Sequence, residues 1–204
     1  MSPIPTELGQ VYAAEKSWAM RARNGAWNTE VQQPPRLLFP GAFNPLHDGH
    51  LKLAQFAANR FQLDVCFEIA IRNADKPAIA APQLLNRLEQ FQQNEVLVTD
   101  LPSFTEKSRH FPGCHFVIGI DTAIRIMDLR FYNNSFEILS ASLSEIDDNG
   151  CRFIVAPRLI DGEVCTFSDF NIFQNFSRLF HEIRPQEFRV DLSSTELRSS
   201  TSLD

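Results

Sequence analysis

Residues 36–50 read Arg-Leu-Leu-Phe-Pro-Gly-Ala-Phe-Asn-Pro-Leu-His-Asp-Gly-His, and this stretch decides the fold. Residues 36–39 are short and apolar, which predicts a buried parallel strand. The strand should end at Pro40, because proline has no N–H to donate to a sheet. Gly41 then frees the backbone for a sharp turn. The apolar spacing of residues 51–61 predicts a helix that begins near Asp48 or Gly49.

A strand, a glycine turn and a helix N-terminus together form an anion site, because free amides and the positive end of the helix dipole point at the ligand. His47 and His50 are three residues apart, so near a helix start they can share one face. Gly49 between them removes a side chain that would obstruct a phosphate. Alternatives are two surface histidines or a zinc pair, but no cysteine has ligand-like spacing to them, and we predict no protein metal site. The other common phosphate-loop motifs are absent from the sequence.

Further along the chain, strands are predicted at 64–71, 95–99 and 115–118, with helices after Pro82, at 121–128 and at 134–146. Residues 151–156 and 163–167 are predicted to be two strands joined through Asp161-Gly162 as a hairpin. Strands that alternate with helices imply right-handed βαβ units. We therefore expect an α/β fold with a Rossmann-like, doubly wound, mostly parallel sheet and helices on both faces.

Two segments are predicted: an N-terminal extension or linker at 1–33 and a domain at 34–204. Within the extension, Leu8, Val11, Tyr12 and Trp18 suggest one face of a short helix, and residues 23–28 suggest a linker. The alternative is an ordered arm that packs on the core.

The composition limits the classes of partner that we expect the protein to bind. A net charge of −6 and a pI near 5.4 argue against nucleic acid as a partner. The four cysteines form no C-x-x-C pair, and the N-terminus lacks a secretory pattern, so we expect reduced thiols and a cytoplasmic protein. No apolar run approaches membrane-spanning length, so no membrane partner is expected. Monomer and homo-oligomer both remain open.

Two further clusters complete the predicted site. Gly119-Ile120-Asp121 follows an apolar strand, where open sheets bind ligands; Asp121 could accept from ribose hydroxyls or cap a helix. In residues 191–198, Asp-Leu-Ser-Ser-Thr-Glu-Leu-Arg, a serine can cap a helix whose amides and hydroxyls face an anion, and Arg198 adds a planar fork suited to phosphate. A plain capping box is the alternative for this segment.

These three clusters carry a family resemblance. Residues 41–50 match the G-x-F-x-P-x-H-x-G-H pattern of the HxGH nucleotidyltransferases. Gly119-Ile120-Asp121 is similar to the G-x-D of that family, and residues 192–198 are similar to its I-S-S-T-x-x-R. Over roughly residues 34–200 the chain resembles the nicotinamide/nicotinate mononucleotide adenylyltransferases. The resemblance implies an enzyme that joins the AMP moiety of ATP to a mononucleotide phosphate, in the nicotinamide or nicotinate form, and releases pyrophosphate.

The resemblance also implies the residue roles. The catalytic residues would be His47, His50 and Arg198. ATP would be bound by Gly41, Ala42, Phe43, Gly119, Asp121, Ser193, Ser194 and Thr195. Mg²⁺ would be held mainly through the ATP phosphates and water.

The acceptor side departs from the family pattern. Ser103-Phe104-Thr105 keeps the start of an S-Y-T-x-D-T-like segment and loses the rest, while Leu129-Arg130-Phe131-Tyr132 stands where relatives often have a tryptophan. Lys76, and Arg72 in the same loop, are candidates for binding the acceptor phosphate. The alternative is that both are simply charged side chains of a solvent-exposed loop. The predicted acceptor residues are Asn44, Lys76, Phe104, Thr105, Phe131 and Tyr132.

Two other functions stay open. The chain could be another nucleotidyltransferase, with pantetheine phosphate as acceptor or with cytidylyl transfer. It could also be a non-catalytic nucleotide-binding module, against which the intact His47, His50 and Arg198 argue.

Overall fold

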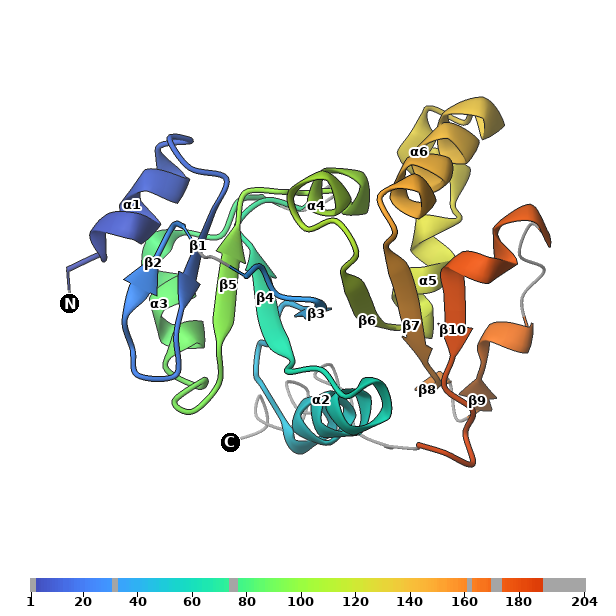
Figure 1. Cartoon of the computed structure of the whole chain (residues 1–204), viewed down its shortest axis with the longest axis horizontal. Coiled ribbons are helices and arrows are strands. Elements are labelled where there is room, and N and C mark those ends of the chain that lie inside the picture. The colour runs from blue at the N-terminus through green and yellow to red at the C-terminus, as the bar shows by residue number, and fades with distance from the viewer. Residues whose placement is uncertain (1–2, 31–32, 74–76, 161–162, 170–173, 189–204) are drawn as a thin grey trace, which may run out of the picture.

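The protein is described by a computed structural model that covers residues 3–30, 33–73, 77–160, 163–169 and 174–188. Its centre is an eight-stranded sheet in the order β10-β7-β6-β3-β4-β5-β1-β2 (Figure 1). The parallel strands are β3 (Leu37–Pro40), β4 (Cys66–Ala70), β5 (Val96–Thr99), β6 (His115–Gly119), β7 (Arg152–Ala156) and β10 (Phe180–Glu182). The predicted α/β fold with a mostly parallel sheet is confirmed.

The order of the strands places the ligand edge. From β3 the chain builds outward to β4 and β5, then crosses back and builds β6, β7 and β10 on the other side of β3. The order therefore reverses between β3 and β6, and in open sheets the crevice at the carboxyl ends of two such strands is where ligands bind. The strand predicted from residues 36–39 does end at Pro40, and the helix expected near Asp48 is α2 (Asp48–Phe61).

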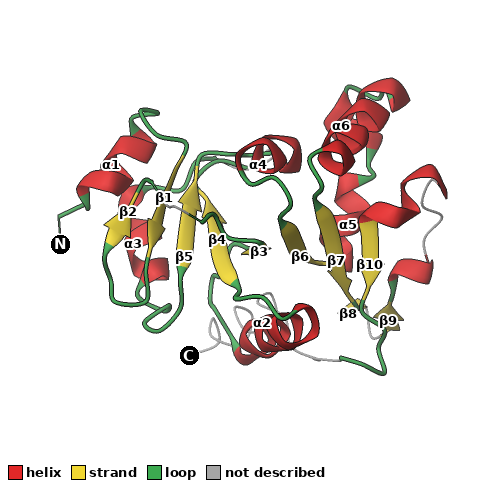
Figure 2. Ribbon diagram, viewed as in Figure 1, coloured by secondary structure: helices red, strands yellow, loops and turns green. Residues whose placement is uncertain are grey.

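Helices cover both faces of the sheet, as Figure 2 shows. One face carries α2 and α3 (Ala81–Leu88), whose leucines and alanines join the apolar side chains of β3 to β5. The other face carries α4 (Phe104–His110), α5 (Ile120–Ile126) and α6 (Phe136–Asp148), packed on phenylalanines of β6, β7 and β10. Burial on both sides explains why β4 and β5 are buried at every position.

The N-terminal segment is part of this sheet. Leu8 and Val11 of α1 (Thr6–Tyr12) are fully buried, as the predicted helix face required. Trp18 does not extend that face; it begins β1 (Trp18–Arg21), which pairs antiparallel with β5. Residues 23–28, expected as a linker, instead form the turn into β2 (Trp27–Asn28) and that strand itself.

The hairpin predicted from residues 151–156 and 163–167 forms with another segment as its first strand. Residues 152–156 form β7, which lies between β6 and β10 in the main sheet. The antiparallel partner of β9 (Glu163–Cys165) is the separate strand β8 (Arg158–Ile160). Pro157 separates the two strands, and because it has no N–H to donate, the chain leaves the parallel ladder there. Three 3₁₀ turns complete the described chain: η1 (Leu129–Tyr132), η2 (Phe167–Asp169) and η3 (Gln174–Leu179).

Candidate active site

The turn after β3 is held by its glycine and by a buried phenylalanine. The Gly41 N–H donates to the Glu68 carbonyl of β4 at 2.9 Å, which ties the turn to the sheet. Phe43 has a φ of 43°, and its ring folds back beneath Gly41. A Cβ at position 41 would lie 2.6 Å from the Phe43 ring, closer than real carbon contacts allow. Glycine is therefore needed at position 41 because of this close approach.

The Phe43 ring forms the floor of the site. It is only 1% exposed and meets Phe39, Phe67 and Phe91 edge-on. Its edge also contacts the His50 ring, with 5.0 Å between ring centroids. The side chain of Phe43, a predicted nucleotide-binding residue, therefore packs against His50. That its backbone amide contacts phosphate stays a prediction.

Helix α3 braces the same turn from outside. Gln90, just after α3, donates to the Phe43 carbonyl at 3.2 Å and accepts from the Leu46 amide at 2.8 Å. Arg87 donates to the Ala42 carbonyl at 3.1 Å. These two residues cannot be identified from the sequence, because the polar positions of a helix do not indicate which of them contacts a turn more than forty residues away.

His47 and His50 cap the N-terminus of α2 reciprocally. The Gly49 amide donates to Nδ1 of His47 at 3.1 Å, and the His47 amide donates to Nδ1 of His50 at 3.3 Å. The two rings stack with 3.7 Å between centroids and 27° between planes. An Nδ1 that accepts a hydrogen bond leaves the proton of a neutral imidazole on Nε2, the nitrogen farther from the backbone. Both rings therefore present an Nε2–H donor.

The surroundings keep both histidines neutral. Burial lowers the pKa of His50 to about 3, with further lowering by the neighbouring His47 and by Arg158. Burial also lowers the pKa of His47, again with a contribution from Arg158, against a smaller opposing effect of Asp48. A neutral imidazole keeps one N–H donor, so each ring can donate a hydrogen bond to a phosphate oxygen without carrying a charge.

The second predicted cluster lies at the end of β6, the strand next to β3. Asp121 is not the helix cap that the sequence also allows, because α5 begins at Ile120, and Gly119 occupies the cap position without a side-chain hydrogen bond. The Asp121 carboxylate instead pairs with Arg158, with 2.7 Å between Oδ2 and Nη1. Its other oxygen, Oδ1, lies 2.5 Å from where a Cβ at Gly119 would be. The glycine of G-x-D thus gives room to the aspartate.

Arg158 was missed by the sequence analysis. It follows Pro157 directly after β7, so the rule that ligands bind at carboxyl ends of parallel strands could have identified it. Its guanidinium reaches Asp121 and acts electrostatically on both His47 and His50. The structure therefore places Gly41, His47, His50, Gly119 and Asp121 after the carboxyl ends of the adjacent strands β3 and β6, and it adds Arg158 after the neighbouring strand β7.

The predicted acceptor residue Phe104 is packed into the core. Its ring meets Phe116 and Phe153 edge-on, at 5.3 Å and 5.1 Å between centroids, and Lys107 Nζ lies 5.2 Å from its centre. Lys107 is itself buried and pairs with the buried Glu68 at 3.1 Å. This ion pair fixes α4 to β4.

The remaining described acceptor residues range from half-buried to exposed. Phe131 is 39% exposed, with the Arg125 guanidinium 5.4 Å from its ring centre. Tyr132 is half-buried, and burial raises the pKa of its hydroxyl. Thr105 is half-buried, and Asn44 is exposed on the turn after β3. The acceptor roles of all four stay predictions.

Other predictions fall outside the described residues: Lys76, Ser193, Ser194, Thr195 and Arg198. Within the described part of the chain there is no group of three or more His, Cys, Asp or Glu side chains that could hold a metal ion. Among the helices described, none is both long and apolar enough to cross a membrane.

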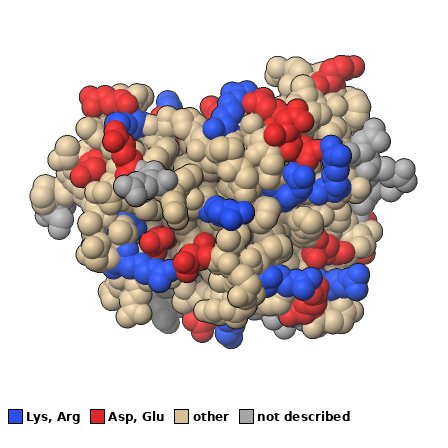
Figure 3. Space-filling view, in the orientation of Figure 1, with Lys and Arg blue, Asp and Glu red and all other residues tan. Residues whose placement is uncertain are grey.

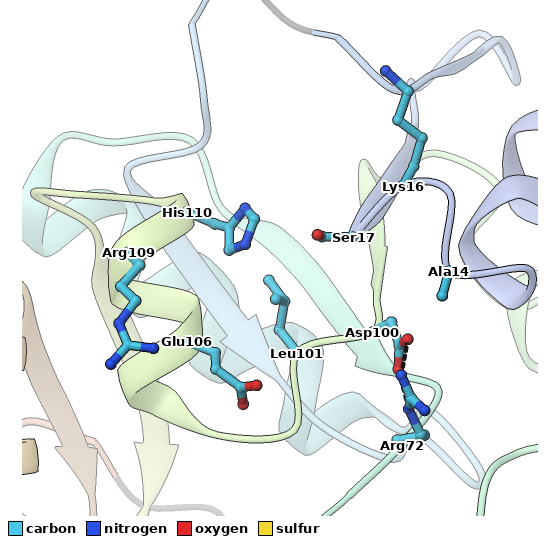
Figure 4. Close-up of a pocket in the computed structure, with 9 residues that line it drawn as sticks. All are labelled: Ala14, Lys16, Ser17, Arg72, Asp100, Leu101, Glu106, Arg109 and His110. Carbon is cyan, nitrogen blue, oxygen red and sulfur yellow. Dashed lines mark hydrogen bonds and ion pairs between the residues drawn. The ribbon is translucent and has the colours of Figure 1, made fainter.

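A pocket of about 370 Å³ lies to one side, between the start of β1, the end of β5 and α4 (Figure 4). Arg72, a candidate for binding the acceptor phosphate, is one of the residues that line this pocket. Its guanidinium donates to both carboxylate oxygens of Asp100. Apart from Arg72, none of the described residues in the predicted site lines this pocket. On the face drawn in Figure 3, acidic and basic side chains are interspersed.

The sequence is similar to a known family and to two named proteins. The family model of cytidylyltransferase-like proteins matches residues 38–200. A protein of Gloeobacter violaceus named "Probable nicotinate-nucleotide adenylyltransferase" is 26% identical over 172 residues, which is 79% of this chain and 81% of that protein. A protein of Desulfotalea psychrophila with the same name is 70% identical over 27 residues, 13% of each chain.

The family match covers the strand, turn and helix that carry the histidine pair, and it begins at Leu38 within β3. Residues before 38, including α1, β1 and β2, lie outside it. The chain belongs to the cytidylyltransferase-like family and is a nucleotidyltransferase of the HxGH superfamily.

Proposed function

We propose that this protein transfers the adenylyl group of ATP to the phosphate of nicotinate or nicotinamide mononucleotide and releases pyrophosphate. The observation that carries the proposal is the stacked pair of neutral histidines at the start of α2, each with its Nε2 proton available. The names of the two similar proteins support the acceptor class.

In the proposed reaction an oxygen of the mononucleotide phosphate attacks the α-phosphorus of ATP, and the bond to the β-phosphate oxygen breaks. Negative charge develops on the equatorial oxygens of the α-phosphate and on the departing pyrophosphate. His47 and His50 donate Nε2–H hydrogen bonds to these oxygens, and their positions are fixed in advance by the helix amides. No covalent intermediate with the protein is needed, because positioning and charge stabilisation suffice for phosphoryl chemistry.

The other residues have supporting roles in the proposal. Asp121 accepts from ribose hydroxyls, while Ser193, Ser194, Thr195 and Arg198 hold the β- and γ-phosphates. Mg²⁺ enters with ATP and neutralises its phosphates; we propose that it is held by phosphate oxygens and water, because Mg²⁺ gives up its water reluctantly.

A panel assay tests this function. The full chain is incubated with ATP or CTP and with nicotinate mononucleotide, nicotinamide mononucleotide or pantetheine phosphate, and pyrophosphate release is measured. Release with ATP and a pyridine mononucleotide alone supports the proposal. Release that requires CTP or pantetheine phosphate contradicts it, as does the absence of release with every pair.

A further inference from the structure

The ion pair between Asp121 and Arg158 links two strands at the ligand edge. Asp121 is on α5, directly after β6, and Arg158 opens β8, directly after β7. The side chains are 45% and 36% exposed, and Nη1 of Arg158 lies 2.7 Å from Oδ2 of Asp121. The pair therefore stands at the surface of the crevice, within reach of a ligand.

Arg158 also lies near the phosphate-binding side. It follows β7, which is next to β6, and β6 is next to β3, the strand that leads into the histidine turn, so Arg158 and the histidines stand at the same edge of the sheet. Its positive charge also contributes to the lowered pKa of both His47 and His50. A guanidinium carries several N–H donors in a planar fork, which suits two oxygens of a phosphate.

We propose that Arg158 binds the phosphates of the nucleoside triphosphate and that Asp121 holds it in place until the nucleotide arrives. This inference rests on the proposed function for the identity of the nucleotide. On binding, Asp121 exchanges the guanidinium for a ribose hydroxyl, and Arg158 exchanges the carboxylate for phosphate oxygens. Both partners of the pair keep a hydrogen-bonding partner throughout.

The exchange is physically reasonable at this position. An ion pair that is more than one third exposed is screened by water, so breaking it has a small cost. The triphosphate brings several negative charges to two neutral histidines. A cation already oriented beside them stabilises those charges without a large rearrangement.

The first test compares ligands with and without phosphates. Arg158→Gln and Arg158→Lys are titrated by calorimetry with ATP and with adenosine, and in parallel with CTP and cytidine. We expect Arg158→Gln to raise the Kd for ATP about 10- to 100-fold, the usual effect of losing a charge-assisted phosphate contact. The Kd for adenosine should stay unchanged or fall, because Asp121 becomes free. Arg158→Lys should recover part of the loss, since it keeps the charge without the fork.

The control is Arg23→Gln, which removes a surface arginine paired with Asp64 at 3.2 Å in the N-terminal hairpin, outside the family match. It should change neither Kd. Equal loss of ATP and adenosine affinity in Arg158→Gln would show a structural role and overturn the proposal, and so would an unchanged Kd for ATP.

A second test measures the exchange itself. A double-mutant cycle of Asp121→Asn and Arg158→Gln, followed by Tm, should show coupling in the free protein that disappears with saturating ATP. Coupling that persists with ATP bound would refute the exchange.

Failure of the proposed function is distinguishable, because these measurements need no acceptor and no turnover. If CTP binds in place of ATP, the proposed donor is wrong. The role of Arg158 in phosphate binding is then tested by the same comparison made with CTP and cytidine.

Discussion

The two halves of the predicted site are built differently. On the predicted nucleotide side, Gly41, His47 and His50 are held by contacts of the turn and helix in which they occur. On the predicted acceptor side, Phe104 is held by residues from β6, β7 and α4. Local contacts can be read from a motif, whereas packing between distant elements cannot. The motif therefore accounts for the contacts of the histidine turn and not for the packing of Phe104.

The largest expected effect concerns the anchor of α4. Lys107→Met removes one partner of a buried ion pair and leaves the Glu68 carboxylate without its cation. We expect the free energy of unfolding to fall by about 3–5 kcal/mol. Urea unfolding measures it, and the double variant with Glu68→Gln should recover part of the loss. A Lys107→Met protein as stable as the parent would show that the acceptor side does not depend on this anchor.

On the nucleotide side, His50→Ala should leave the fold intact and lower turnover about 10²- to 10³-fold, the usual loss for one positioned donor. Pyrophosphate release with the best substrates from the panel gives the rate, and thermal unfolding checks the fold. His181→Ala, an exposed histidine on β10, is the control and should match the parent. If His50→Ala turned over substrate at the parental rate, the histidine pair would have no role in the reaction.

Gly41→Ala should act through the core beneath the turn. The new Cβ would lie 2.6 Å from a Phe43 ring that Phe39, Phe67 and Phe91 hold in place, so we expect a loss of about 1–3 kcal/mol from overpacking. Gly9→Ala in α1 is the matched control, because a Cβ there meets nothing within 4 Å. Equal effects of the two variants on denaturant midpoints would contradict the close approach.

Acid should weaken the nucleotide side in a defined window. The folded protein holds the pKa of His50 at about 3, against 6.5 for an ordinary histidine, so the unfolded chain binds more protons between these values. The contribution of His50 to stability is therefore fully present above about pH 6.5 and is lost as the pH falls toward 3. The Tm of the parent should decline more steeply over this range than the Tm of His50→Gln. Parallel declines would contradict the buried, neutral ring.

The smallest effect is expected at the acceptor ring. If Phe131 or Tyr132 stacks on a cationic pyridine ring, its replacement by alanine removes about 0.5–2 kcal/mol and raises the KM for the mononucleotide several-fold. The KM for ATP should barely change, because its site is separate. Phe104→Ala should affect stability instead, since its ring is already packed. If neither the Phe131 nor the Tyr132 variant changes the acceptor KM, the ring binds elsewhere.

The sequence by itself determined the strand, turn and helix around residues 36–61, because their contacts lie within a few residues. Pro40 ends the strand, Gly41 allows the turn, and the two histidines stand at the start of the helix. The parallel sheet also followed from the alternation of strands and helices. These features need only local geometry and the rules of chain connection.

Only the tertiary structure decided the contacts between residues that are far apart in the sequence. Asp121 and Arg158 are 37 residues apart, Gln90 and Phe43 are 47 apart, and Lys107 and Glu68 are 39 apart. The N-terminal strands also join the sheet through pairing with β5, which no nearby residue specifies. Such contacts depend on how elements pack, and many side chains of the same type could have made them. Local geometry therefore fixed the histidine pair, and packing fixed what surrounds it.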